Sequence, residues 1–263
     1  MKKIWTIIEK ELKHYFYSPI AYVVMVVFLS LTGFFFYVGL SRFSMMYENY
    51  KNLAQMTQNP QYLESLNLNE IVIAPSLFNM AFILLFLIPL LMMRSFAEEK
   101  SKKTDELLKT APLSTTHIVW GKYLSAFLFV LCMILPTVIY QIFLFASLDN
   151  PPELGPVITG YVSLILYTAT ALAIGMFASS LTENQIVAAV MTFVVLLLLF
   201  VISSIGLKEG SILYSMVQYI SIPEHMKAML RGVVDSRDVV YFLSLSGLFV
   251  FLTHRSLDVQ GWR

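Results

Sequence analysis

Residues 75–93 read PSLFNMAFILLFLIPLLMM, a run that contains no charged side chain. The hydrocarbon core of a bilayer offers no water to backbone N–H and C=O groups, so an apolar run of about 20 residues predicts a membrane-spanning helix. Arg94 follows directly, and a dense cluster of charges comes after it. This pattern predicts an integral membrane protein whose chain emerges from the membrane at Arg94.

The composition of the whole chain agrees with this interpretation. Of its 263 residues, 57% are hydrophobic and 13% are charged, and the mean hydropathy is +0.71. Soluble domains carry about 25% charged residues, so the composition argues against a soluble enzyme. The formal net charge of +1 creates no basic field that would attract nucleic acid. Cys132 is the single cysteine, which excludes an internal disulfide and a CxxC metal site.

Five further apolar stretches complete a set of six predicted spans within one transmembrane domain, residues 1–263. The spans are residues 19–40, 75–93, 118–148, 157–179, 186–205 and 239–253, and the outer loops are residues 41–74, 149–156 and 206–238. The third span is overlong and contains Pro136, which predicts a tilt or a kink. Arg237 and Arg255 flank the short sixth span and can reach the polar interfaces.

The distribution of Lys and Arg predicts the orientation. With both termini inside, the inner segments hold twelve of these residues and the outer loops hold six. Positive charge accumulates on the cytoplasmic side of membrane proteins. We therefore expect a multi-pass protein of the bacterial cytoplasmic membrane with both termini in the cytoplasm.

Residues 2–17 predict an amphipathic helix on the inner membrane surface, because Ile4, Ile8 and Leu12 share one helical face. Glu11 lies seven residues after Ile4 and falls within this apolar face. A carboxylate there needs a partner or access to water. Two interpretations stay open: the side chain reaches the lipid headgroups, or it forms an ion pair with a basic residue of the next inner loop, such as Arg94.

The inner loop 94–117 is the most informative part of the chain. Thr104 is a good N-cap, and Asp105 and Glu106 in the first turn suit a helix dipole. Leu107 and Leu108 give a very short helix an apolar side, and Pro112 ends it. Such a helix is suited to docking on a partner, while the alternative is a solvated connector.

Three other segments have less specific patterns. Residues 41–71 are polar and form either a lid or a linker, and the semi-apolar residues 207–237 indicate a re-entrant or interfacial hairpin. Small residues recur at four-residue spacing at Ala171, Gly175 and Ser179, which suits close helix packing. Packing within the chain is favoured over a homodimer interface for these three.

Several kinds of chemistry lack the residues they need. No G-x-x-x-x-G-K-[ST] loop occurs, so the chain has no such nucleotide site. The four histidines lie at separate predicted membrane edges, which argues against a metal site. The middles of the spans are nearly free of ionisable residues, which argues against an ion-coupled carrier. An intramembrane enzyme would need a convergent catalytic set that the sequence does not contain. Energy for transport would come from a partner.

The inner segments resemble those of the ABC-2 type permeases, the membrane subunits of ATP-binding-cassette transporters. The similarity rests on Lys10-Glu11-Leu12 before the first span, on FAEEKSKKTDELLKTAPLS at residues 96–114, and on IVWGK at residues 118–122. Lys103 stands where the family commonly has glycine. TENQIVAA at residues 182–189 and RSLDVQGWR at residues 255–263 resemble the subgroup of gliding-motility-associated and nitrous-oxide-maturation permeases.

The resemblance implies an all-α fold of six transmembrane helices, with an N-terminal elbow helix that carries Glu11 and a coupling helix between spans two and three. It implies no catalytic residue and no bound cofactor, since ATP and Mg would bind to two separate ATPase subunits. A second permease copy or a paralogue would complete the pathway within the membrane lipid. The residues implied to couple to the ATPase are Glu98, Glu99, Thr104, Asp105, Glu106, Leu107, Leu108 and Pro112.

Two functions follow from the resemblance. In the first, the chain forms half of an export pathway and couples ATP hydrolysis to export across the cytoplasmic membrane. In the second, the same architecture acts as an ATP-driven mechanotransmitter on an extracytoplasmic partner and moves no solute. The aromatic content of 14% would suit a hydrophobic cargo, but aromatic residues are also ordinary interfacial anchors.

Overall fold

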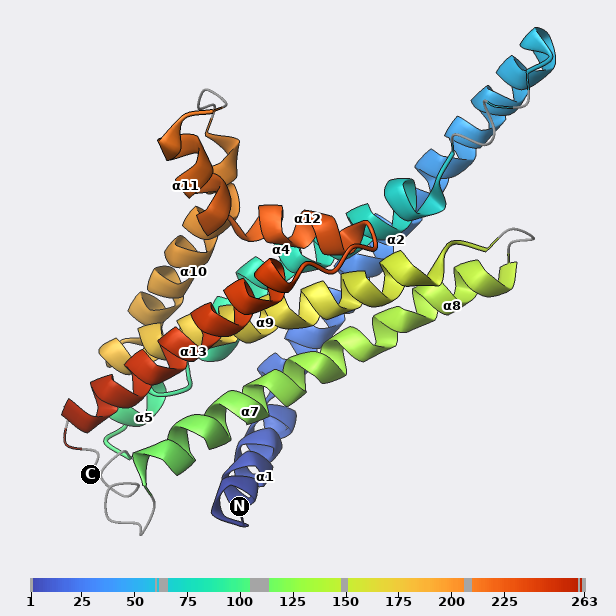
Figure 1. Cartoon of the computed structure of the whole chain (residues 1–263). Coiled ribbons are helices and arrows are strands. Elements are labelled where there is room, and N and C mark those ends of the chain that lie inside the picture. Colours follow the sequence, from blue (N-terminus) through green and yellow to red (C-terminus); the bar gives the residue numbers. More distant parts are fainter. Residues whose placement is uncertain are drawn as a thin grey trace.

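The computed structural model describes residues 2–59, 61, 66–104, 114–147, 151–205, 210–259 and 261. Within these residues the regular elements are all helices, which confirms the all-α prediction (Figure 1). The elements are α1 (Lys2–Tyr17), α2 (Pro19–Thr57), η1 (Asn69–Ile73), α4 (Ala74–Met92), α5 (Ala97–Ser101), α7 (Thr115–Ile134), η2 (Leu135–Thr137), α8 (Val138–Ser147), α9 (Leu154–Leu181), α10 (Gln185–Val201), η3 (Ile202–Ser204), α11 (Ile212–Ile220), α12 (Ile222–Leu230) and α13 (Ser236–Val259).

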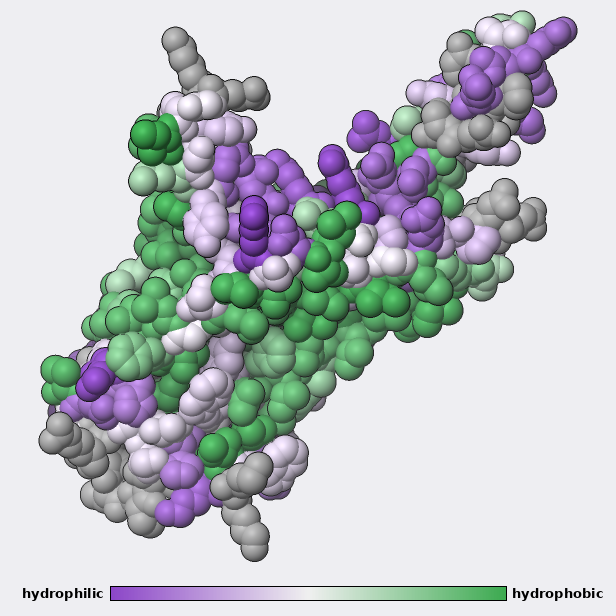
Figure 2. Space-filling model, viewed as in Figure 1, coloured by the Kyte–Doolittle hydropathy of each residue, from purple (hydrophilic) through white to green (hydrophobic). Residues whose placement is uncertain are grey.

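Six helical segments are long and apolar enough to cross a membrane, which confirms the number of predicted spans. They are Pro19–Thr57, Asn69–Ser101, Thr115–Ser147, Leu154–Leu181, Gln185–Ser204 and Ser236–Val259. Figure 2 shows a broad hydrophobic band across the middle of the molecule, with hydrophilic residues gathered toward its two ends. The chain is a multi-pass membrane protein.

Helix α9 forms the centre of the bundle. It packs against α4, α7, α10, α12 and α13, and Leu164, Tyr167 and Leu172 on it are fully buried. Its glycines allow close approach: a Cβ at Gly160 would lie 2.5 Å from Leu77 Cδ1. Helix α1, α5, the start of α7 and the end of α13 lie together at one end of the bundle, here called the basal end (Figure 1).

Helices α2 and α13 extend well beyond their predicted spans. Helix α2 continues to Thr57 instead of ending near Leu40, so much of the predicted outer loop 41–74 is helical. The sequence from Leu40 to Asn59 contains neither Gly nor Pro, and a helix can continue in water once its residues turn polar. Helix α13 likewise extends beyond residues 239–253 at both ends.

Proline residues shape two of the long helices. At Pro136, where a tilt or a kink was predicted, the 3-10 turn η2 separates α7 from α8. At Pro75 the preceding turn is a π-helix, η1, in which the Ala74 N–H donates to Asn69 O. Proline removes one backbone donor and crowds the preceding turn, so the widened turn accommodates it.

Residues 210–235 contain two short helices joined at Ser221. Helix α12 packs on α9, where the Thr159 hydroxyl donates to Met229 O at 2.6 Å. The buried His225 ring joins the corner, with Nδ1 2.7 Å from Asp238 Oδ1 and Nε2 2.8 Å from Tyr219 O. The ring also stacks on Tyr241 at 3.9 Å between centroids. These contacts fix α12 across the end of the bundle opposite the basal end.

Candidate functional site

The predicted inner segments meet at the basal end. Helix α1 lies directly against the first turns of α7, and a Cβ at Gly121 would lie only 2.5 Å from Ile7 Cγ2. Glycine at this position lets the two helices approach closely. The N-terminal helix is thereby fixed to the helix that follows the loop 94–117.

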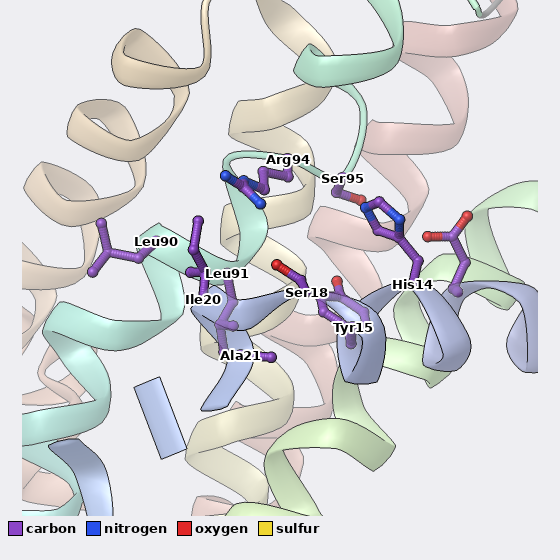
Figure 3. Close-up of a pocket in the computed structure, with 10 residues that line it drawn as sticks. His14, Tyr15, Ser18, Ile20, Ala21, Leu90, Leu91, Arg94 and Ser95 are labelled. Atoms are coloured by element: carbon purple, nitrogen blue, oxygen red, sulfur yellow. The ribbon is translucent and has the colours of Figure 1, made fainter. Parts of the chain in front are cut away.

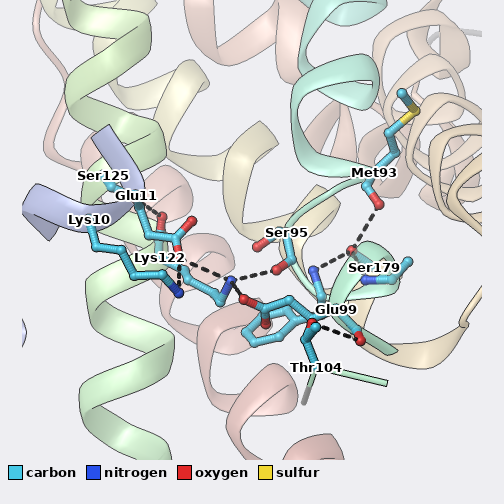
Figure 4. Close-up of polar contacts among 11 residues, drawn as sticks. Lys10, Glu11, Met93, Ser95, Glu99, Thr104, Lys122, Ser125 and Ser179 are labelled. Atoms are coloured by element: carbon cyan, nitrogen blue, oxygen red, sulfur yellow. Dashed lines mark hydrogen bonds and ion pairs between the residues drawn. The ribbon is translucent and has the colours of Figure 1, made fainter. Parts of the chain in front are cut away.

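Lys122 of α7 connects the basal segments. Its ammonium group is buried and donates to Glu99 Oε1 at 2.8 Å and to Ser95 O at 2.8 Å, and it lies 3.4 Å from Glu11 Oε1 (Figure 4). It also lies 5.3 Å from the centre of the Phe96 ring. One cation therefore joins α1, α5, α7 and the segment between α4 and α5. We call Lys122, Glu11 and Glu99 the basal ion cluster.

Glu11 forms an ion pair, which is the second of the two interpretations given above. The prediction that Arg94 is its partner is wrong. The carboxylate lies 3.4 Å from Lys122 Nζ and 3.6 Å from Lys10 Nζ. Arg94 instead lies 3.8 Å from Glu98. The reason is geometric: α1 packs along α7, and this places Glu11 beside the side chain that α7 buries.

Lys122 is the functional residue that the sequence analysis missed. It was counted among the inner positive charges and quoted within IVWGK at residues 118–122, but it was given no role. A signal was nevertheless present, because a lysine five positions into the predicted span 118–148 needs a partner.

Ser179 at the end of α9 holds the start of α5. Its Oγ accepts from the N–H groups of Phe96 at 3.0 Å and Ala97 at 3.1 Å, so a distant side chain caps a helix that has no local cap. Ala171, Gly175 and Ser179 are all buried within this chain, and a Cβ at Gly175 would lie 2.7 Å from Met92 Cβ. The small-residue face thus packs inside the chain.

Helix α5 ends in a tight turn. Thr104 N–H donates to Glu99 O at 2.9 Å and Lys103 N–H to Lys100 O at 3.0 Å, the two bonds of a Schellman motif. Lys103 has a φ of 55°, the left-handed conformation that glycine adopts most easily. Lys103 therefore adopts the turn that glycine would favour.

Replacing Lys103 by Gly is expected to raise the stability of the basal end by about 0.5–1 kcal/mol, because glycine removes the penalty of the left-handed conformation. Hydrogen exchange of the α5 amides measures the effect, and slower exchange is the expected result. Lys102→Gly is the matched control, since Lys102 lies next to it with a φ of −87°. Faster exchange in Lys103→Gly than in the parent would contradict the prediction.

A cleft of about 320 Å³ opens beside the basal ion cluster. Its walls carry both signs of charge, with Lys10, Arg94 and Lys102 near Glu98 and Glu99. A smaller hollow of about 30 Å³ lies next to it between α1 and the end of α4, with His14 and Tyr15 on its wall (Figure 3). Burial, and to a lesser extent the Glu11 carboxylate, raises the pKa of Tyr15 well above its usual range.

Three of the residues predicted to couple to an ATPase, Glu98, Glu99 and Thr104, lie within the described residues. Among the described residues no group of three or more His, Cys, Asp or Glu side chains could hold a metal ion. Glu98 pairs with Lys102 at 2.6 Å and Thr104 is exposed. The other predicted coupling residues, Asp105, Glu106, Leu107, Leu108 and Pro112, lie outside the described residues. The described residues stop at Thr104, whose N–H donates to Glu99 O, and resume at Ser114, the N-cap of α7.

Comparison with known proteins gives one informative result. A search of curated proteins returns no significant match. A family model described as ABC-2 family transporter protein matches residues 5–254, nearly the whole chain. The match covers most of α1, the basal ion cluster, five of the six segments in full and most of the sixth, so the chain belongs to the ABC-2 family and is a transmembrane subunit of an ABC transporter.

Proposed function

We propose that this protein couples ATP hydrolysis by separate nucleotide-binding subunits to export across the bacterial cytoplasmic membrane. The observation that carries the proposal is the basal ion cluster, which ties the elements on both sides of residues 105–113 to α1. Two ATPase subunits, which bind ATP and Mg, would lie beneath two permease copies or a permease and a paralogue. Both termini would then be cytoplasmic.

The geometry supports a specific route for the force. An ATPase that moves residues 105–113 pulls on α5 at one end and on α7 at the other. Through Glu99 and Lys122 the same motion reaches Glu11 and α1. Pro89 inside α4 and Pro136 between α7 and α8 are the places where these helices bend most easily. The proposed coupling role includes Glu98, Glu99 and Thr104, which directly precede residues 105–113 in the chain.

We also propose membership of the gliding-motility-associated and nitrous-oxide-maturation subgroup, on the basis of residues 182–189 and 255–263.

A second candidate function, mechanotransmission, is supported by α2. This helix runs 17 residues past the predicted span end at Leu40, which corresponds to about 26 Å at 1.5 Å per residue. Figure 1 shows its end projecting beyond the rest of the molecule, where an extracytoplasmic partner could bind.

The double substitution Leu107→Asp and Leu108→Asp tests the coupling assignment. Two carboxylates on the apolar side of the docking helix that the sequence predicts should lower recovery of the ATPase at least tenfold, since their burial is unfavourable. The measurement is a detergent pull-down of the full chain, expressed with its neighbouring genes, followed by mass spectrometry and an ATPase assay.

Leu53→Asp is the matched control, because Leu53 is 44% exposed near the far end of α2. It should leave ATPase recovery unchanged. Full ATPase recovery with the Leu107 and Leu108 double variant would show that the docking assignment is wrong. The same pull-down distinguishes the two functions: co-purification of an extracytoplasmic protein that Leu53→Asp releases would favour mechanotransmission over export.

A further inference from the structure

A second hollow lies at the end of the bundle opposite the basal end. It has a volume of about 440 Å³ and opens between η1, the first turns of α4 and the end of α12. Its apolar lining residues are Ala74, Pro75, Phe78 and Leu230. Glu70, Lys227 and Arg231 form a charged rim. The volume falls in the range of small-molecule sites, and we call this feature the distal hollow.

The fold positions the rim charges on two elements that are far apart in sequence. Lys227 and Arg231 are one helical turn apart at the end of α12, which is fixed to α9 by the hydrogen bond from Thr159 to Met229 O. Glu70 comes from the π turn η1. Such turns often occur at functional sites, because they move a side chain out of the regular helical position. Figure 2 shows hydrophilic residues gathered over α12 and η1, directly beside the hydrophobic band.

The rim charges do not neutralise each other. Lys227 Nζ lies 2.5 Å from Glu224 Oε1 on its own helix. In the part of the chain that the structure describes, Glu70 and Arg231 take part in no ion pair or side-chain hydrogen bond, although they have opposite charges and line the same hollow. Glu70 and Arg231 are both exposed. The space between them suits a ligand that carries a cationic and an anionic group.

The apolar lining adds a further requirement. Phe78 of α4 and Leu230 of α12 line the hollow, and Phe78 belongs to the apolar segment Asn69–Ser101 that can cross a membrane. A soluble zwitterion would leave this surface uncovered. A phospholipid with an ammonium headgroup satisfies all the parts: its ammonium group can donate to Glu70, its phosphate can accept from Arg231 and Lys227, and its glycerol and acyl carbons can cover Phe78 and Leu230.

We propose that the distal hollow binds a phospholipid with a primary ammonium headgroup, such as phosphatidylethanolamine. This site lies at the opposite end from the basal ion cluster, and its existence does not depend on ATPase docking. Binding would hold η1 and α12 together across the hollow.

Native mass spectrometry of the purified full chain in detergent tests the proposal, with phosphatidylethanolamine, phosphatidylcholine and phosphatidylglycerol titrated separately. The expected result is a preference of about tenfold for phosphatidylethanolamine, since one charged hydrogen bond contributes that much. Glu70→Gln should remove the preference and leave phosphatidylglycerol binding unchanged. Arg231→Met should weaken binding of all three lipids, because each carries a phosphate.

Glu48→Gln and Arg42→Met are the matched controls, since both residues are exposed on the distal part of α2. They should retain the binding pattern of the parent protein. Equal affinity for the three lipids, or an unchanged preference in Glu70→Gln, would overturn the proposal. Displacement of bound lipid by equimolar phosphoethanolamine would also overturn it, because the ligand would then be a soluble headgroup. Circular dichroism of each variant verifies that the helices are intact.

Discussion

Lys122→Met is expected to destabilise the protein by about 3–5 kcal/mol, because it leaves the buried Glu11 carboxylate and the half-buried Glu99 carboxylate without the buried cation that joins them. Methionine keeps most of the side-chain volume, so the loss comes from charge and not from a cavity. The corresponding fall in the unfolding temperature in detergent is roughly 10 °C. Circular dichroism during heating measures it, and size-exclusion chromatography of heated samples provides an independent reading.

Two further variants test whether the destabilisation by Lys122→Met comes from the basal ion cluster and not from the loss of any lysine. Lys13→Met removes a lysine that lies 2.7 Å from Glu9 but is 62% exposed, and a surface ion pair of this kind contributes little. The triple variant Lys122→Met, Glu11→Gln and Glu99→Gln removes the stranded charges together with the cation. It should recover part of the lost stability. An unfolding temperature for Lys122→Met equal to that of the parent would contradict the assignment of Lys122 as the centre of the basal ion cluster.

Gly175→Leu is expected to separate α9 from α4. A Cβ at this position would lie 2.7 Å from Met92 Cβ and 3.1 Å from Thr192 Cγ2. Because Met92 Cβ is attached directly to the backbone, it cannot rotate away, and the helices themselves must shift. Overpacking of a core costs about 1–3 kcal/mol, and the displacement also disturbs the hydrogen bonds from Phe96 and Ala97 to Ser179. We expect a lower yield of monodisperse protein and a lower unfolding temperature.

Gly247→Leu is the control for helix composition. A Cβ at Gly247 in α13 meets no atom within 4 Å, so leucine has room there, and loss of a helical glycine should be neutral or slightly favourable. Comparable destabilisation by both substitutions would mean that close packing at Gly175 is not the cause. The comparison needs only the two variants and the parent in the same detergent.

The parts of the fold that were predictable are those where contact with lipid dictates composition. Residues 75–93 could be assigned to a span because every backbone group there must be satisfied within a helix. The extension of α2 to Thr57 was missed for the complementary reason. Hydropathy reports contact with lipid and not helicity, so a polar helix beyond the membrane resembles a loop. Only the absence of Gly and Pro between Leu40 and Asn59 indicated otherwise.

The sequence indicated that a buried charge needs a counterion, but it did not indicate which residue provides it. The position of Glu11 on an apolar face indicated a need for a counterion, but the counterion lies 111 residues away in sequence. Nothing local to Glu11 distinguishes Lys122 from Arg94. The distal hollow could not be predicted from the sequence at all, because Glu70 and Arg231 come from separate segments that only the packing of α12 on α9 brings together.

Helix α9 has a consequence for how the two ends of the molecule influence each other. It is 28 residues long, about 42 Å, with Thr159 bonded to α12 near one end and Ser179 bonded to the start of α5 at the other. If a shift of α9 alters both ends, then thermodynamic linkage requires the effect to be reciprocal: occupancy at one end changes affinity at the other by the same factor. A lipid bound beside α12 would then act as an allosteric effector of ATPase docking, and the docked ATPase would change the affinity for that lipid equally.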